Sequence, residues 1–242
     1  MQTNKTVAYC GDLQTWETLF SRQWQAVKDF ANAPYIEGMA LLNFSKNQIP
    51  TFDEINDKLH VITAWRIYPV PGLIANDYFF DQLYDKKFGI TNWLRKPAQI
   101  DYLEEPDMFH DVFGHIPHLT NPFICNYLFQ LAALAKAHNY APVILEAIAR
   151  LYWYTVEFGL VKENGAIKIY GAGIMSSIAE TAYCFSNKPS LLPFDIELII
   201  QTPYIKDDFQ KQYFVLESFT DLSSAVNLLQ KEISNPAFTI KM

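Results

Sequence analysis

Three of the chain's five histidines, His110, His115 and His118, lie within nine positions. Because imidazole nitrogens are common ligands of transition metals, this group is a candidate metal site. A helical zinc-protease motif spaces two histidines by four residues, whereas His110 and His115 are five apart, about 140° around an ideal α-helix. The protease motif is therefore absent. Two imidazoles at this spacing reach one metal only if the helix distorts, or ends near Gly114 and Pro117.

A third ligand must come from a carboxylate. Two histidines and one carboxylate leave three positions of an octahedral ion open, which suits ferrous iron that binds dioxygen and a co-substrate. We prefer Glu157, because it lies in the apolar stretch WYTVEFGL, where an unpaired charge is costly. Without a metal, Glu157 could instead form an ion pair with Arg150. The three histidines could instead be exposed, or buried in the core with other partners. The other candidate carboxylates are Glu104, Glu105, Asp107 and Asp111.

Composition limits the class of protein. A chain of 242 residues that is 50% hydrophobic can bury one large core, so we expect one domain. The net charge of -7 and the lack of a Lys or Arg run argue against a nucleic-acid partner and favour a small molecule. Residues 143–161 are apolar but carry Glu146, Arg150 and Glu157, which argues against a membrane span.

The cysteines and the first residues of the sequence indicate the compartment. Cys10, Cys125 and Cys184 are odd in number and form no CxxC pair, so neither a disulfide framework nor a thiolate metal site is indicated. No export signal opens the sequence. We expect a cytoplasmic protein.

Hydrophobic periodicity predicts a mainly α-helical single domain with a few short β-strands. Apolar residues spaced by three or four predict a helix from Leu13 to Ala31 that ends before Pro34, and Thr51 with Glu54 forms a capping box for the next helix. Further helices are expected from Asn76 or Asp77 to Phe88, from Pro122, from Pro142 to near Val161, from Pro193 to Ile200 and from Leu222 to Ile233. Strands are expected over Trp65–Val70, Gln212–Leu216 and from Lys168.

Four stretches together carry a family resemblance: VPGLI, EPDxxHDxxGHxP, YWYTVEFGL and YGAGIMSS. In this order they resemble the catalytic domain of the aromatic amino acid hydroxylases, and they are most similar to the bacterial members that act on phenylalanine. The similarity runs from about Thr15 to Leu222. It implies that His110, His115 and Glu157 are iron ligands and that His118 is not.

The resemblance also implies a cofactor site. Gly72, Leu73 and Phe79 match the tetrahydropterin site, where the Phe79 ring would stack on the pterin and backbone groups would bond its polar edge. Asp111 stands near the pterin at a position that is commonly Glu in the family.

A substrate site is implied in the same way. Arg95 matches the residue that pairs with the substrate carboxylate, with a solvated surface charge as the alternative. Trp153 matches the wall of the ring pocket, although it could belong to the core, while Gly173 and Ser176 match the loop that borders the amino acid pocket. Asp107 would support Arg95 or a ligand imidazole, or else cap a helix.

The function that follows is hydroxylation of L-phenylalanine to L-tyrosine by an iron(II) monooxygenase that uses dioxygen, with tetrahydropterin supplying two electrons. Tyrosine or tryptophan hydroxylation is the alternative within the family. Two alternatives from other functional classes are a zinc hydrolase and a non-enzymatic amino acid sensor. Residues 1–242 are expected to form one catalytic domain without a regulatory or tetramerisation domain, and to act as a monomer.

Overall fold

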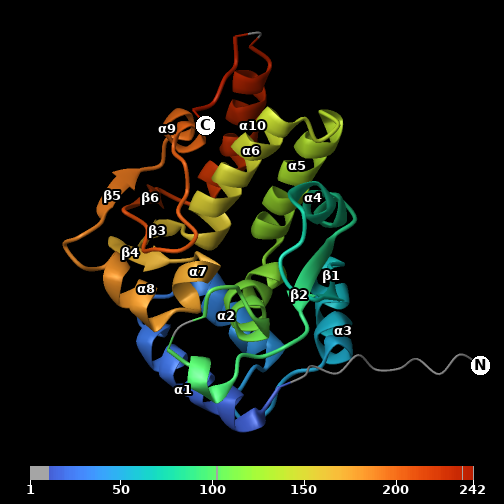
Figure 1. Cartoon of the computed structure of the whole chain (residues 1–242), viewed down its shortest axis with the longest axis vertical. Helices are drawn as coiled ribbons and strands as arrows, with labels where there is room; N and C mark the ends of the chain where they lie inside the picture. The colour runs from blue at the N-terminus through green and yellow to red at the C-terminus, as the bar shows by residue number, and fades with distance from the viewer. Residues whose placement is uncertain (1–10, 102, 236, 242) are drawn as a thin grey trace, which may run out of the picture.

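Helices dominate the computed structural model, which describes residues 11–101, 103–235 and 237–241 (Figure 1). The α-helices are α1 (Leu13–Val27), α2 (Ala33–Leu42), α3 (Phe52–Thr63), α4 (Asn76–Tyr84), α5 (Pro122–Ala137), α6 (Pro142–Tyr152), α7 (Ala172–Met175), α8 (Ile178–Cys184), α9 (Ile196–Gln201) and α10 (Thr220–Ile233). Two 3₁₀ helices, η1 (Pro97–Gln99) and η3 (Ile116–Thr120), and two π-helices, η2 (His110–His115) and η4 (Trp153–Glu157), lie between them. The strands are β1 (Arg66–Val70), β2 (Lys87–Thr91), β3 (Leu160–Glu163), β4 (Ala166–Ile169), β5 (Ser190–Pro193) and β6 (Gln212–Leu216). The predicted fold class is confirmed.

Helix starts follow the local sequence closely. The Thr51 hydroxyl accepts from the Glu54 backbone N–H at 3.2 Å, and the Glu54 carboxylate accepts from the Thr51 N–H at 2.7 Å, so the predicted capping box is present. Asn121 caps α5 by accepting from the Phe123 N–H at 2.9 Å. The first helix ends at Val27, earlier than predicted. Pro34 opens α2 instead of ending α1, because proline is tolerated in the first turn of a helix.

The first sheet is a two-stranded parallel pair joined by a helix. β1 and β2 run parallel, with Arg66 opposite Lys87 and Val70 opposite Thr91, and α4 connects them. The helix predicted to reach Phe88 ends at Tyr84, and Phe88 lies in β2, a strand that was not expected. This unit places its side chains beside the candidate site.

The second sheet has the strand order β4-β3-β6-β5. β3 and β4 form an antiparallel hairpin whose two turn residues, Asn164 and Gly165, have φ of 51° and 79°. β6 pairs in parallel with β3 and β5. The helix predicted to end near Val161 stops earlier, and β3 already begins at Leu160. The helix expected from Pro193 begins at Ile196, because residues up to Pro193 form β5.

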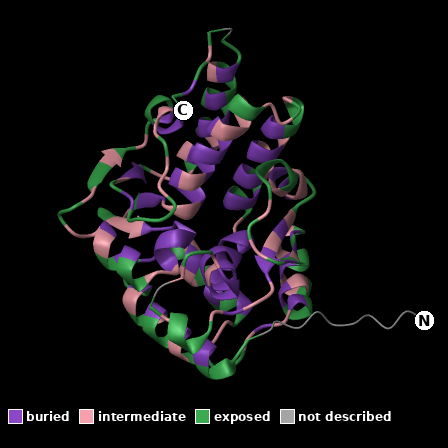
Figure 2. Cartoon of the chain, in the orientation of Figure 1, coloured by how far each residue is buried: buried purple, intermediate pink, exposed green. Residues whose placement is uncertain are grey.

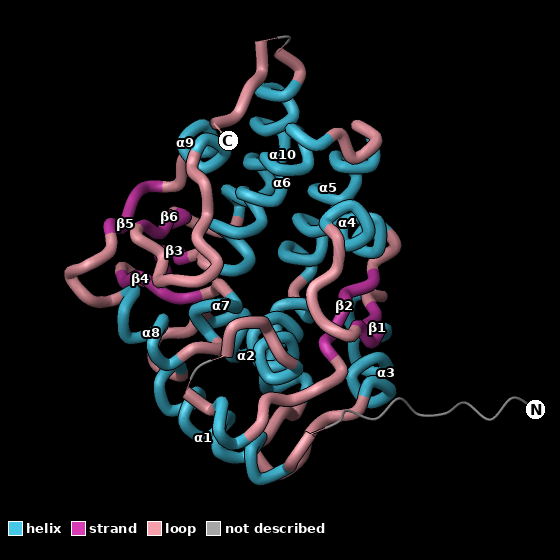
Figure 3. The backbone as a smooth tube through the Cα atoms, in the orientation of Figure 1, coloured by secondary structure: helices cyan, strands magenta, loops and turns pink. Residues whose placement is uncertain are grey.

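Helices α5, α6 and α10 lie together in the upper half of the molecule, with the two sheets on opposite sides of it (Figures 1 and 3). Buried residues line the inner faces of these helices, whereas exposed residues follow the outer rim (Figure 2). η2 and η4 both contact the short helix α7. The two segments that carry the predicted ligands are thus brought together at the lower end of the bundle.

Two further expectations concern membranes and thiols. Among the described residues, no helix combines the length and the apolar character needed to cross a bilayer. Cys125 and Cys184 are buried free thiols, and burial raises the pKa of each to about 12. Cys10 lies outside the described residues.

Candidate metal and substrate site

His110 and His115 face each other because the segment between them is a π-helix. Their Nε2 atoms are 3.2 Å apart. A π-helix bonds residue i to residue i+5, so its wider turn returns the fifth residue to the same side, which an α-helix does not do. Gly114 lies inside this turn, and a Cβ there would come within 2.9 Å of the Ala172 carbonyl oxygen. The expected helix distortion is present, and it takes the form of a π turn.

Glu157 completes the cluster from the end of a second π-helix. Its Oε1 lies 3.2 Å from His115 Nε2, and its Oε2 lies 3.6 Å from His110 Nε2. The three donor atoms lie within 4.8 Å of one another. Arg150, the alternative partner, forms its ion pair with Glu146 at 2.8 Å. The carboxylate therefore faces the imidazoles, and its donor set fits a two-histidine, one-carboxylate iron site.

The charges within the cluster favour an ionised carboxylate. Burial opposes ionisation of Glu157, but His115 and His110, together with the Tyr152 hydroxyl, lower its pKa to about 2. For His115, burial works against protonation, yet the nearby Glu157 raises the pKa. Burial lowers the pKa of His110. A buried anion beside two imidazole nitrogens is a suitable environment for a divalent cation.

Ser176 fixes the orientation of the His110 ring. Its hydroxyl donates to the Ala172 carbonyl at 2.8 Å and lies 2.7 Å from His110 Nδ1, from which it must therefore accept. Nδ1 thus carries the proton, and Nε2 is left free to bind a metal. We expected Ser176 beside the amino acid pocket, but its hydroxyl is occupied in supporting a ligand.

Asp107 holds Arg95 in place. Arg95 Nε and Nη2 donate to the two carboxylate oxygens at 2.8 and 2.9 Å, and the Asp107 side chain is fully buried. Burial opposes ionisation of Asp107, but the Arg95 charge keeps its pKa below the usual value. Asp107 also accepts from the backbone N–H of His110 at 3.1 Å, so the support role and the capping role are both present.

Arg95 itself is not a solvated surface charge. Its side chain is only 11% exposed, and its guanidinium carbon lies 6.0 Å from the centre of the Phe109 ring. Within the described residues, no hydrogen bond uses Nη1. The guanidinium is therefore oriented by Asp107 and retains donors for a second anion.

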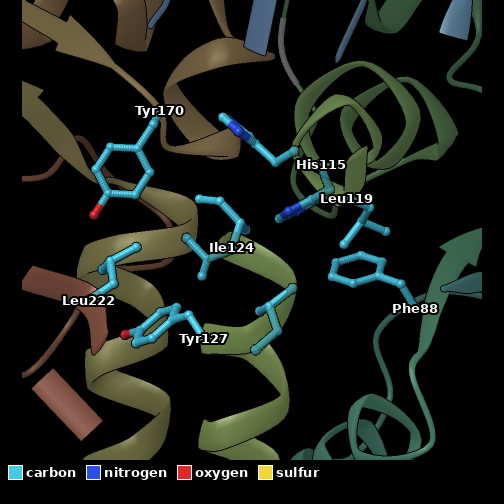
Figure 4. A pocket seen from close by; sticks show the side chains of 10 residues that line it. Phe88, His115, Leu119, Ile124, Tyr127, Tyr170 and Leu222 are labelled. Atoms are coloured by element: carbon cyan, nitrogen blue, oxygen red, sulfur yellow. The ribbon is translucent and has the colours of Figure 1, made fainter. Parts of the chain in front are cut away.

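The predicted pterin residues lie on a loop and a helix beside β2. Gly72 and Leu73 belong to the loop before α4, and Leu73 is 67% exposed. The half-buried Phe79 meets Phe88 edge-on at 5.8 Å, and Phe88 lies 4.9 Å from the His115 ring. Figure 4 shows Phe88 and His115 near one another along the wall of the pocket.

Asp111 joins this region to the metal ligands. Its Oδ2 accepts from the Thr91 N–H at the end of β2 at 2.7 Å, and its Oδ1 lies 4.0 Å from His110 Nε2. Burial raises the pKa of Asp111, against the effect of His110 and His115. Asp111 is thus held between the end of β2 and the His110 ring.

Trp153 is part of an aromatic stack. Tyr204 stacks on it with ring centres 4.6 Å apart, and Phe158 packs against it at 4.8 Å. A Cβ on Gly173 would come within 2.7 Å of Phe158 Cζ, so the glycine leaves room for this ring. Because Trp153 is only partly buried and belongs to the same π-helix as Glu157, it can line a pocket next to the metal.

His118 lies behind His115 and outside the cluster. Neither of its ring nitrogens has a hydrogen-bond partner among the described residues, and burial lowers its pKa to about 3. The Tyr170 backbone only partly offsets this effect. His118 lines a cavity of about 10 Å³ together with Tyr170 and apolar side chains (Figure 4). It is not placed to bind the same ion, as predicted.

Two contributors were missed from the sequence, Tyr152 and Gln210, and the contact of Tyr204 with Trp153 was not expected. Tyr152 precedes Glu157 by five residues, the spacing also found between His110 and His115, and this repeated interval is the signal that could have found it. Gln210 accepts from the Trp153 indole N–H at 3.0 Å. No local pattern indicates Gln210 or Tyr204, because their contacts depend on how a distant loop folds back.

Comparison with known proteins is consistent with this geometry. The family described as biopterin-dependent aromatic amino acid hydroxylase matches residues 4–242. The phenylalanine-4-hydroxylase of Chromobacterium violaceum is 45% identical over 217 residues, which is 88% of this chain and 72% of that protein.

Solved structures agree as well. The crystal structure of the C. violaceum enzyme with bound iron(III) and 7,8-dihydrobiopterin has a TM-score of 0.86 and 42% identity, covering 95% of this chain and 84% of that one. The apo phenylalanine hydroxylase of Colwellia psychrerythraea has a TM-score of 0.88 and 37% identity, covering 95% and 89%. This chain belongs to the biopterin-dependent aromatic amino acid hydroxylases.

Proposed function

We propose that the chain hydroxylates L-phenylalanine to L-tyrosine with dioxygen, using ferrous iron and a tetrahydropterin. The observation that carries this proposal is the convergence of His110, His115 and Glu157, whose donor atoms lie within 4.8 Å of one another. The relatives support it, because they are named phenylalanine-4-hydroxylases, and one was crystallised with iron(III) and dihydrobiopterin.

The metal would be held by His110, His115 and Glu157. Iron with open positions, together with the tetrahydropterin, would supply the electrons and the site at which dioxygen reacts. Ser176 keeps the proton of His110 on Nδ1, so that Nε2 remains a ligand. No side chain of the site needs to act as a general base, and the protein's task is to hold and orient its reactants.

The substrate would be held at both ends. Arg95, fixed by Asp107, would bind the amino acid carboxylate with its remaining donors. Trp153 would pack against the ring, and the neighbouring Phe158 and Tyr204 rings would help to exclude water. Gly173 contributes by leaving space for Phe158.

The pterin would lie on the side of β2. Phe79 would stack against it, and the backbone of Gly72 and Leu73 would bond its polar edge. The aromatic contacts from Phe79 through Phe88 to His115 support this placement, since they connect the loop side to the metal ligands. Asp111, next to His110, would border the pterin.

The test is product analysis. The protein is loaded anaerobically with ferrous iron, and tetrahydropterin, air and one of phenylalanine, tyrosine or tryptophan are added. We expect tyrosine from phenylalanine, and no product from the His110→Ala variant. Hydroxylation of tyrosine or tryptophan instead would reassign the substrate. No product from any of the three would favour the zinc hydrolase or the amino acid sensor.

Arg95 can be tested in the same assay. We expect Arg95→Ala to oxidise pterin without forming an equal amount of tyrosine, because a substrate lacking its carboxylate contact is poorly aimed. Fully coupled turnover by this variant would remove Arg95 from the substrate site.

We further propose a single catalytic domain that acts as a monomer in the cytoplasm. The described residues share one hydrophobic core, which supports the single domain. The free thiols Cys125 and Cys184 fit a reducing compartment. Light scattering coupled to size-exclusion chromatography tests the monomer, and a mass near twice 27.9 kDa would contradict it.

A further inference from the structure

Trp153 has both ring contacts and a hydrogen bond at its edge. Phe158 and Tyr204 pack against it, with ring centres 4.8 and 4.6 Å away. The indole N–H of a largely buried Trp usually finds an acceptor. A hydrogen bond at this edge also restricts the rotation of the indole, beyond what its rotamer and packing do. Trp153 Nε1 donates this bond to Gln210 Oε1 at 3.0 Å.

The Gln210 amide is itself oriented by its surroundings. Its Nε2 donates to the Ile205 carbonyl at 2.6 Å and lies 3.4 Å from the Asp208 carbonyl. Because the NH₂ group points at these two acceptors, the amide oxygen points the other way, toward the indole. The residue is only 2% exposed, so water does not compete for these bonds.

The backbone of Gln210 is anchored to a helix. Its N–H donates to Glu180 Oε1 at 3.4 Å, and the Tyr213 hydroxyl donates to the same oxygen. Glu180 is buried in α8, and Tyr213 lies in β6. Gln210 thus connects the loop of residues 202–211, a helix and a sheet to one edge of Trp153.

We propose that Gln210 is a positioning residue that sets the angle of the Trp153 ring and thereby aims the substrate ring. The inference rests on the proposed function of the site. Trp153 and Glu157 begin and end the same π-helix, so the wall stands at a set place relative to the candidate metal ligand. Gln210 touches neither metal nor substrate, and acts through the indole alone.

The experiment is a double-mutant cycle in the full chain with Gln210→Met, Trp153→Phe and the double variant. Methionine has a volume close to that of glutamine, but it lacks the amide oxygen, and its thioether sulfur is only a weak acceptor. We expect Gln210→Met to lower kcat/KM for L-phenylalanine roughly tenfold and to reduce the tyrosine formed per pterin oxidised, since a 1 Å misplacement costs about a hundredfold. In the Trp153→Phe background, the same change should alter kcat/KM by less than about twofold. Equal effects in both backgrounds would overturn the proposal.

Gln201→Met is the matched control. Gln201 also bonds backbone groups through both ends of its amide, Thr239 at 2.7 Å and Lys241 at 3.0 Å, and its side chain forms no hydrogen bond with Trp153 among the described residues. We expect this change to leave kcat/KM and coupling unaltered. If Gln210→Met does not fold, Gln210→Asn, which withdraws the amide by one methylene, replaces it in the cycle.

Isothermal titration calorimetry of L-phenylalanine with the wild type and the three variants, kept anaerobic, distinguishes failure of the proposed function from failure of the proposed role of Gln210. If the wild type binds phenylalanine but forms no tyrosine, the proposed function fails, and non-additive binding in the cycle would still support Gln210. If the wild type forms tyrosine and the cycle is additive in both binding and kcat/KM, the function stands and the role of Gln210 is refuted.

Discussion

The metal side of the site and the proposed pterin side, the loop of Gly72 and Leu73, are built in different ways. His115 is 4% exposed and lies in a π turn whose first residue, His110, donates partly buried hydrogen bonds to Ser176 and Asp107. On the pterin side, Leu73 is 67% exposed and lies in a loop. The first region is formed by the folded core, whereas the second presents loop backbone to solvent.

Because of this difference, we expect substitutions on the two sides to change different properties of the protein. A change at the metal side disturbs groups that are buried and mutually bonded, so it should affect metal affinity and stability together. A change in the exposed loop should affect cofactor binding alone, because few contacts of the fold depend on it. The following predictions test this contrast, beginning with the largest effect.

Removal of the carboxylate ligand should have the largest effect. We expect Glu157→Gln to lower iron retention and hydroxylation by at least about a hundredfold, since even changes to groups that support a ligand cost ten- to a hundredfold. Metal analysis after gel filtration and a tyrosine assay measure this. Glu146→Gln in α6 is the control and should keep its iron, because Glu146 pairs with Arg150 and not with the histidines. Full iron retention by Glu157→Gln would exclude it as a ligand.

Iron binding should stabilise the fold. At a free ferrous iron concentration of 100 times Kd, the folded state gains about 2.7 kcal/mol. For a chain of this length, that corresponds to a rise in Tm of roughly 5–10 °C. Anaerobic thermal unfolding with and without iron measures the shift, and tetrahydropterin at the same free concentration should produce a smaller one. An equal shift from pterin at that concentration would contradict the contrast between the two sides.

Two adjacent serines offer a matched pair. Ser176→Ala removes the acceptor from His110 Nδ1, and we expect about a tenfold loss in iron affinity. Ser177 caps α8 by accepting from the Glu180 N–H, so Ser177→Ala should cost about 1 kcal/mol in stability and leave iron affinity unchanged. Iron titration and chemical unfolding of both variants measure the two effects. Equal iron affinities would show that Ser176 does not support the ligand.

The smallest effect is expected in the loop. Leu73→Pro removes one backbone N–H, and we expect KM for tetrahydropterin to rise roughly fivefold to tenfold, the effect of one hydrogen bond. Leu73→Ala keeps the N–H and should change KM by less than about twofold, with stability within about 0.5 kcal/mol. If Leu73→Ala raises KM as much as Leu73→Pro, the side chain rather than the backbone binds the pterin.

Local signals in the sequence predicted much of the fold. The Thr51 capping box, the start of α5 at Pro122 and the strand over Gln212–Leu216 were all predicted correctly. The β3–β4 hairpin was missed, although Asn164-Gly165 is a strong signal for a two-residue turn with φ above zero at both positions. The apolar run before it continued the periodicity of α6 and concealed the change from helix to strand.

The site was less accessible to pattern reasoning. Spacing alone left His110 and His115 about 140° apart. Glu157 was preferred among the carboxylates because of its apolar surroundings, and the family resemblance then supported that choice. The π turns that reconcile the spacing with the cluster have no reliable sequence signal. Asp107 and Arg95 were paired correctly, whereas Gln210 could not be found, because its contact with Trp153 spans 57 residues along the chain.

The π turn between the two histidines also bears on insertions and deletions. A deletion of one residue between His110 and His115 would leave them four apart, the interval at which an ordinary α-helix places two imidazoles on one face. The present arrangement holds one residue more per turn, and that added residue lets Gly114 approach Ala172 closely. The length of this segment is therefore as much a part of the metal site as the identity of its histidines.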